Sequence, residues 1–284
     1  MSTKDSGDIQ AQLKKALEEC ASLREENTRL RKLLEFIGYS SENLIPPLKR
    51  SEKDSFVQEV PGPYSVSDQS STEAQVSLFR SLFRGREDVY PVRWERKDGR
   101  SGYSPACGNE WNRVYCRKPK VKCADCENRS LEPVTDEVIH GHLTGKHTIG
   151  VYPLLPEKTC WFLAVDFDKK TWREDTSEFI RASEEKGIHA AVGRSRSGHG
   201  AHIWFFISRP IPALLARKFG SVLLVRAIER RYQIGLDSYD RFFPSPHTLP
   251  TGGFGNLIAL PLQHRATEKG NTLFLNRAFE PYPS

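Results

Sequence analysis

Long hydrophobic runs are missing from this 284-residue sequence. No stretch approaches the roughly 18 consecutive apolar residues that a membrane-spanning helix needs, and the N-terminal residues lack the hydrophobic core of a secretory signal peptide. We therefore expect a soluble, cytoplasmic protein that does not enter a membrane. Hydrophobic residues still make up 38% of the chain, which is enough for one large or two small domains with a true core.

Cysteine is also scarce, with six residues in the chain. In a cytoplasmic protein so few cysteines indicate metal ligands or free thiols, and they argue against a disulfide framework. Four of them gather in residues 107–126: Cys107, Cys116, Cys123 and Cys126. Four thiolates can close a tetrahedral Zn²⁺ site that fixes a segment too polar to fold by burial. The eight-residue gap in the first pair is wider than usual, so four unliganded thiols are the alternative to the predicted structural Zn²⁺.

Acidic residues are outnumbered by basic ones, 36 to 42, which gives a formal net charge of +6. Arginine and lysine occur throughout the chain, with aromatic residues between them. Six basic residues fall between Arg113 and Arg129 alone. This balance modestly favours a polyanionic partner, such as a nucleic acid.

A heptad pattern occupies the N-terminal residues. Apolar positions recur with alternating spacings of four and three from Ile9 to Ile37, and Asn27 falls at an a position, where a buried amide favours an in-register pair of helices. We expect a parallel coiled coil in residues 1–37 that forms a homodimer. The alternative is a single amphipathic helix packed on its own domain. Residues 38–69 are rich in proline, serine and charge, and are predicted to be a linker.

Strand and helix patterns fill residues 70–284. A capping pattern at Ser70 to Glu73 predicts a helix that begins near Ser71 and closes at Gly85. After a strand over 148–154, the expected order is β-α-β-β-α-β, a split βαβ arrangement with a ferredoxin-like or RRM-like α+β fold. Its predicted elements are strand 159–167, helix 171–186, strands 188–195 and 201–208, helix 213–232, and final strands 257–262 and 272–275. In the second helix the expected buried residues are Leu214, Leu215, Val222, Leu223, Val225 and Ile228.

Two carboxylates end the predicted strand 159–167. Asp166 and Asp168 follow an apolar run and, at positions i and i+2, emerge on one face of the strand. Like charges held so close repel, so such a pair usually binds a cation, and oxygen ligands suit Mg²⁺ or Mn²⁺. The alternative is a strand that ends in solvated acids.

A glycine-rich turn is predicted to lie beside these carboxylates, because the first and third strands of this fold are neighbours. Gly198 and Gly200 would let backbone N–H groups approach an anion, and His202 could donate to a phosphate oxygen. Arg194 and Arg196 add positive charge. Alone, such a turn is weak evidence, and a lone strand histidine is more often a core residue.

A third acidic cluster follows the second helix. Either Asp237 or Asp240 could complete a two-metal site, which generally needs a third carboxylate. Further along, the loop Gly252 to Asn256 could approach a nucleotide or a template, or be a plain turn between strands.

Three segments together resemble the motifs of the archaeo-eukaryotic primase superfamily: Val165 to Asp168, Arg196 to His202, and Ser238 to Pro244. The sequence looks most like the primase-polymerase domain of TOTE conflict systems and the related CRISPR-associated primase-polymerases. The similarity extends over roughly residues 74–275 and includes the cysteine segment. The heptad segment lies outside it.

The resemblance implies a function and a set of site residues. A template-dependent DNA or RNA primase-polymerase would use two Mg²⁺ or Mn²⁺ ions, held by Asp166, Asp168 and Asp240, to join nucleoside triphosphates to a 3′-hydroxyl. His202 would contact the triphosphate, and the nucleotide turn would contain Arg196, Ser197, Gly198 and Gly200. The implied partners are nucleoside triphosphates, single-stranded or primed DNA or RNA, and a helicase, because relatives often continue into one. Where the family has Asn-Gln-Asp, this chain has Ser245-Pro246-His247, so the role of that loop stays open.

Two other classes of function compete with this one. A glycosyltransferase with an Asp-x-Asp motif also binds Mg²⁺ and a nucleotide, but it needs neither the Ser-Gly-x-Gly-x-His turn nor a basic template surface. A zinc-containing dimeric adaptor could bind nucleic acid with a decayed active site, although the acids and the histidine are intact.

Overall fold

The structure, a computed structural model, describes residues 66–67, 69–230, 238–246, 248–249 and 252–282. The predicted coiled coil of residues 1–37 and nearly all of the predicted linker lie outside the described residues. The described residues fall in one unit, Val66–Ser284. None of the helices in these ranges combines the length and the hydrophobicity needed to cross a membrane.

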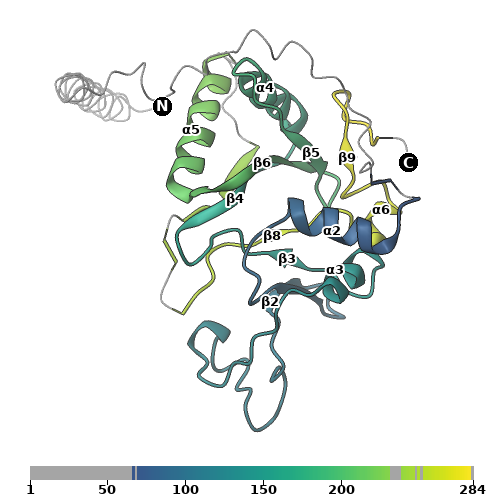
Figure 1. Cartoon of the computed structure of the whole chain (residues 1–284), viewed down its shortest axis with the longest axis vertical. Helices are drawn as coiled ribbons and strands as arrows, with labels where there is room; N and C mark the ends of the chain where they lie inside the picture. Colours follow the sequence, from purple (N-terminus) through teal and green to yellow (C-terminus); the bar gives the residue numbers. More distant parts are fainter. Residues whose placement is uncertain (1–65, 68, 231–237, 247, 250–251, 283–284) are drawn as a thin grey trace, which may run out of the picture. The chain divides into compact units, whose positions relative to one another are not determined.

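A five-stranded antiparallel sheet organises the described residues (Figure 1). Its order is β7-β4-β6-β5-β9, with bounds β4 Thr159–Asp168, β5 Ala191–Arg194, β6 Gly200–Pro212, β7 Tyr239–Phe243 and β9 Phe274–Leu275. Helix α4 spans Trp172–Glu184 and α5 spans Ala213–Arg230. In chain order, β4-α4-β5-β6-α5-β7 has the predicted β-α-β-β-α-β arrangement, so the mixed α/β character is confirmed.

The fourth strand of this arrangement lies earlier in the chain than predicted. Strand β7, which carries the third acidic cluster, pairs with β4. The predicted strand over 257–262 is instead the short β8 (Ile258–Ala259), which pairs with β3 (Gly150–Val151) in a separate sheet. The charged pair Asp240-Arg241 inside β7 hides its strand pattern, while the apolar residues around β8 are buried by packing rather than by pairing with the main sheet.

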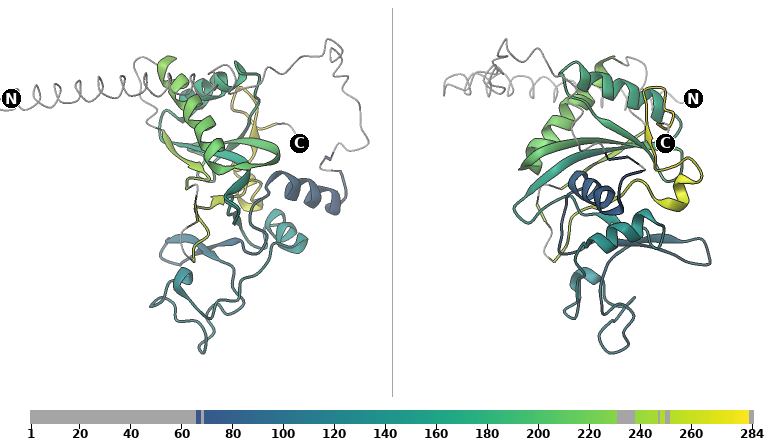
Figure 2. Two further views of the ribbon diagram at one scale, coloured as in Figure 1. Left: turned by 60° about the vertical axis from the view of Figure 1, so that its left-hand side comes forward. Right: turned by 45° about the vertical axis from the view of Figure 1, so that its right-hand side comes forward.

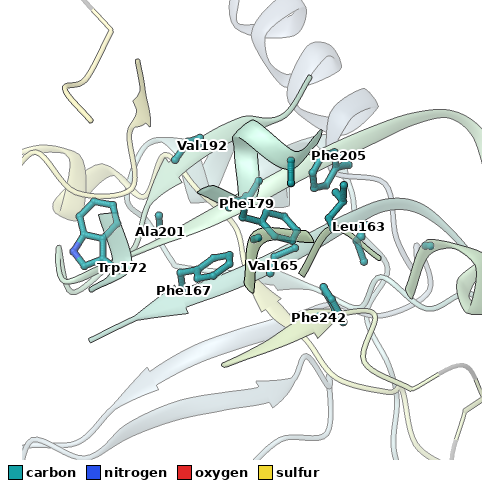
Figure 3. Packing of buried hydrophobic residues seen from close by; sticks show 14 of the residues in the cluster. Leu163, Val165, Phe167, Trp172, Phe179, Val192, Ala201, Phe205 and Phe242 are labelled. Atoms are coloured by element: carbon teal, nitrogen blue, oxygen red, sulfur yellow. The ribbon is translucent and has the colours of Figure 1, made fainter. Parts of the chain in front are cut away.

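Strand alternation divides β4 between two apolar layers. Leu163, Val165 and Phe167 face α4 and α5, where they pack with Phe179, Phe205 and Phe242 (Figure 3). Phe162 and Ala164 face the opposite layer. Helix α2 (Thr72–Leu82) covers that second face (Figure 2). Because Asp166 and Asp168 continue the even-numbered side, they lie on the α2 face, beyond its apolar part.

Helix α2 begins near the predicted Ser71, but its N-cap is Ser71 and not Ser70, and it ends at Leu82, before the predicted Gly85. The Ser71 hydroxyl accepts a hydrogen bond from the Ala74 N–H, and Val76 and Phe79 are buried. Just beyond the helix, the Phe83 ring packs edge-on against Trp204 of β6, with centroids 5.0 Å apart. Helix α2 is thereby fixed to the sheet.

The predicted buried face of α5 is wrong. Of the six residues expected inside, only Leu223 is buried, and the exposed ones are Leu214, Leu215, Val222, Val225 and Ile228. The helix packs instead through small residues, and a Cβ added to Gly220 would lie 2.6 Å from the Phe242 ring. The close approach of helix to sheet needs small side chains, which a search for large apolar residues overlooks.

The remaining elements lie on the α2 side of the sheet. Strands β1 (Pro91–Glu95) and β2 (Ser101–Pro105) form a hairpin, and the cysteine segment follows it with the short helix η1 (Cys123–Asp125), below β2 in Figure 1. Helix α3 (Asp136–Leu143) packs beside α2, and α6 (His264–Thr267) precedes β9.

Candidate active site

Three neighbouring strands bring the predicted site residues into one row. In the register of the sheet, Asp166 of β4 lies opposite His202 of β6 on one side and Arg241 of β7 on the other. The His202 Nε2 lies 3.5 Å from the Asp166 Oδ1, and both side chains are largely buried, at 17% and 22% exposure. Asp240 is next to Arg241 in β7, so the third motif joins the first two.

The three carboxylates Asp166, Asp168 and Asp240 lie close together, and Arg241 is the positive group that acts on them. Burial, followed by the charges of Asp240 and Asp168, raises the pKa of Asp166 to about 7, although Arg241 opposes the shift. One oxygen of Asp168, Oδ1, is buried and has no hydrogen-bond partner among the residues that the structure describes. Asp240 accepts a 2.6 Å hydrogen bond from the Arg241 Nε. Arg241 therefore compensates the acidic pair of Asp166 and Asp168 only in part.

His202 is neutral in this setting. Burial lowers the pKa of its imidazole to about 4, so near pH 7 the ring carries one N–H and one free acceptor nitrogen. A neutral imidazole can donate one hydrogen bond to an anionic oxygen, which is the role that the resemblance implies.

A buried hydrogen-bond network joins the end of β4 to the start of β7. The Asp168 N–H donates to the Ser238 carbonyl at 2.7 Å, and the Ser238 hydroxyl donates to Asp175 at 2.6 Å. The Thr171 hydroxyl donates to the same Asp175 oxygen at 2.8 Å. Asp175 and Ser238 are fully buried. Sequence reasoning missed Asp175, whose position in the first turn of α4 and four residues after Thr171 was the available signal.

The glycine-rich turn between β5 and β6 lies beside the acidic pair. Gly198 has a φ of 79°, and the His199 N–H donates to the Ser197 hydroxyl at 3.2 Å. Gly200 pairs with Asp168 across the sheet, and an added Cβ would lie 2.4 Å from the Phe167 carbonyl oxygen. The close packing of β6 on β4 thus explains Gly200, whereas Gly198 sets the shape of the turn.

Residues far away in the sequence hold this turn. Arg196 donates to Gln263 at 2.9 Å and to Glu95 at 2.7 Å, and the Asn271 side chain donates to the Arg196 carbonyl at 3.1 Å. No local pattern marks Glu95, Gln263 or Asn271 as site residues. Arg194, expected to add charge near an anion, donates to the backbone carbonyls of the C-terminal segment and has a structural role there.

The comparison with family models decides the relationship. The model of the TOTE conflict system archaeo-eukaryotic primase domain matches residues 74–284. The chain belongs to this family. A solved structure described as the polymerase domain from Mycobacterium tuberculosis Ligase D in complex with DNA is similar, with a TM-score of 0.43 and 12% identity, covering 73% of this chain and 82% of that one. No curated protein matches.

The cysteine segment of this primase domain contributes its four cysteines to the lining of one cavity. Cys107, Cys116, Cys123 and Cys126 all line it, and the Ser130 N–H donates to the Cys107 Sγ at 3.3 Å. Within the described ranges, however, no group of three or more His, Cys, Asp or Glu residues is placed to hold a metal ion. The zinc site stays a prediction.

The glycine-rich loop near residue 252 contacts the cysteine segment of the primase domain. Arg129 donates to the Gly252 carbonyl at 2.7 Å, and a Cβ added to Gly252 would lie 2.8 Å from the Ala124 carbonyl oxygen. Asn256 accepts from the Ser245 N–H and donates to the Phe242 carbonyl. These contacts favour the structural alternative for this loop.

Proposed function

We propose that the chain is a template-dependent primase-polymerase, a nucleotidyltransferase that extends a nucleic acid chain. The attacking 3′-oxygen would form a bond to the α-phosphorus of a nucleoside triphosphate while the bond to the β-phosphate breaks and pyrophosphate leaves. The observation that carries the proposal is the row of His202, Asp166 and Arg241 across three adjacent strands, where the charges of Asp168 and Asp240 act on Asp166.

The acidic cluster fits divalent cations. The unpartnered Asp168 oxygen and the raised pKa of Asp166 both mark negative charge that protein groups leave unneutralised. All-oxygen donors suit Mg²⁺ or Mn²⁺, which Asp166, Asp168 and Asp240 would hold. The chemistry that two such ions supply when bound is a lowered hydroxyl pKa at the attacking end and charge neutralisation at the triphosphate. Asp240 would have to exchange its contact with Arg241 for a metal.

The other residues would bind and orient the nucleotide. The neutral imidazole of His202 would donate to a phosphate oxygen. The turn at Ser197 and Gly198 would contact the triphosphate, for which the Gly198 N–H would have to leave the Ser195 carbonyl and the His199 N–H the Ser197 hydroxyl. Gln263 and Asn271 would keep that turn in place through their contacts with Arg196. Arg241 would balance the charge of the row as the substrate enters.

The cysteine segment would carry a structural Zn²⁺, since its four cysteines line one cavity and leave no fourth position open to a substrate. A homodimer through residues 1–37 and a helicase partner also stay proposals.

Extension of a labelled primer tests this function against its rivals. The full chain, incubated with a primed template, nucleoside or deoxynucleoside triphosphates and Mn²⁺ or Mg²⁺, should lengthen the primer and release pyrophosphate. Omitting the primer tests whether synthesis starts without one. Turnover of a sugar nucleotide with no extension would support the glycosyltransferase, and nucleic acid binding without any turnover would support the adaptor.

A further inference from the structure

A cleft separates the β1–β2 hairpin from the cysteine segment. Its volume is about 440 Å³, and its lining includes a tryptophan on each wall, Trp94 from the hairpin and Trp111 from the cysteine segment. Three basic residues also line the cleft: Arg96 next to the hairpin strand β1, and Lys118 and Lys122 in the cysteine segment. None of these residues belongs to the acidic row or the glycine-rich turn.

Both tryptophans are presented to solvent by fixed backbone. Trp94 is 38% exposed, and it lies opposite Gly102, where an added Cβ would approach the indole to 2.7 Å. Trp111 is 67% exposed and has a φ of 62°, a left-handed conformation that is unfavourable for a bulky side chain. A large apolar residue that is exposed and strained adds little to stability, so its presence calls for a functional reason.

A positively charged side chain lies over each indole ring. The Arg96 guanidinium lies 5.4 Å from the centre of the Trp94 ring, and the Lys118 ammonium lies 5.7 Å from that of Trp111. Such pairs place positive charge beside an aromatic face, as proteins that bind single-stranded nucleic acid do.

The acids of the cleft are already paired. Glu110 lies 2.5 Å from the Lys118 ammonium. Glu95 lies 2.9 Å from Arg93 and 2.7 Å from Arg196. The remaining charge of the lining is positive, from Arg96 and Lys122. The cleft therefore offers aromatic faces together with an excess of positive charge.

We propose that this cleft binds single-stranded nucleic acid, with bases stacked on Trp94 and Trp111 and phosphates near Arg96 and Lys122. A paired duplex keeps its bases stacked on one another, so only an unpaired strand can use both indoles. The Glu95–Arg196 ion pair connects the edge of the cleft to the glycine-rich turn. The inference rests on the proposed function to the extent that the bound strand would be its template.

Fluorescence anisotropy of a labelled oligothymidylate of about 20 nucleotides, without metal or nucleotide, tests the cleft in the full chain. Trp94→Ala and Trp111→Ala should each weaken binding about tenfold. Trp111→Phe should keep most of the affinity, because it keeps an aromatic face. Tyr282→Ala removes another exposed aromatic residue, 63% exposed and outside the cleft, and should leave binding unchanged. Thermal unfolding of each variant shows whether it is folded.

Two results with the variants would overturn the inference: folded Trp94→Ala and Trp111→Ala proteins that bind as tightly as the wild type, or a loss of affinity in Tyr282→Ala as large as in the tryptophan variants. Two results with the wild-type chain would do the same: no binding of the oligonucleotide, or competition by a duplex as strong as that by an unlabelled single strand of the same length. The Asp168→Asn variant separates this inference from the proposed function. This variant should bind the oligonucleotide as the wild type does. A tenfold loss of binding in Asp168→Asn would also contradict the proposal that the cleft is the binding site. If the wild-type chain binds through the two tryptophans but never extends a primer, the proposed polymerase function is contradicted. The proposal that the cleft binds single-stranded nucleic acid is then still supported.

Discussion

The His202 Nε2 lies 3.5 Å from the Asp166 Oδ1, across the neighbouring strands β6 and β4. The two residues come from separate sequence motifs 36 positions apart (202 − 166), and the antiparallel register places them directly opposite each other. A predicted phosphate contact and a predicted metal ligand are therefore neighbours.

Asp175 should position the third motif. Asp175→Ala removes the acceptor for Ser238 and Thr171, and we expect a loss of about 1–3 kcal/mol in the free energy of unfolding, because buried hydroxyl donors are left unpaired. Primer extension should fall as well, since Ser238 links β7 to the Asp168 backbone. Asp175→Asn, which retains an acceptor, should lose less of both. Denaturant unfolding measures the first effect, and a variant as stable as the wild type would contradict it.

Gly198 should be needed for activity beyond its effect on stability. Gly198→Ala strains a backbone with φ of 79° and brings a Cβ within 2.7 Å of the Asn271 Oδ1. The matched control is Gly187→Ala, where φ is 70° but no atom of the described residues lies within 4 Å of the added Cβ. Both should lose about 1 kcal/mol of stability. Only Gly198→Ala should raise the KM for the nucleotide, and equal KM values in the two variants would contradict the assigned role of the turn.

His142 should make stability depend on pH. Its Nε2–H donates to the Pro261 carbonyl and its Nδ1 accepts from the Ile149 N–H, so the buried ring is held neutral. Burial lowers the pKa of His142 from 6.5 to about 4. The folded state thus binds this proton less readily than the unfolded chain, and the contribution is fully present above pH 6.5 and lost as the pH falls toward 4.

The contribution of His142 should be of the order of 3 kcal/mol over that range. It is measured by denaturant unfolding at a series of pH values, as the difference between the wild type and His142→Gln, because the shifted pKa values of His202 and Asp166 are common to both proteins. His264→Gln, at an exposed histidine, is the control and should leave the profile unchanged. Parallel stability profiles of the wild type and His142→Gln between pH 6.5 and 4 would show that His142 is not held neutral.

Elemental analysis of the purified chain should find about one zinc per chain. Cys123→Ser should lower the zinc content, whereas Cys160→Ser, at a buried cysteine of the sheet core, should not. Absence of zinc together with four titratable thiols in the segment would refute the structural site.

Local sequence patterns were enough to predict the centre of the fold. The apolar run before Asp166, the glycine-rich turn and the start of helix α2 are each read from a few consecutive residues, and all three lie close to the predicted positions, although the N-cap is Ser71 and not the predicted Ser70. The third motif was recognised from its residues, but its strand was not, because β7 has only five residues and two of them are charged.

Features that depend on tertiary packing could not be predicted in this way. The buried face of α5 follows from how closely Gly220 approaches Phe242, and apolar periodicity does not report that distance. The support of the glycine-rich turn by Glu95, Gln263 and Asn271 joins positions 67 to 101 residues apart. Such pairs become visible only when the chain is folded.

Primer extension by acid variants tests the central claim most directly. Asp166→Asn and Asp168→Asn keep the size of each side chain but remove the charge, so both should reduce extension by at least about a hundredfold. Glu174→Gln, at an exposed acid of α4, should extend primers like the wild type. Full extension by a folded Asp166→Asn or Asp168→Asn variant would contradict the claim that this carboxylate pair is the catalytic centre.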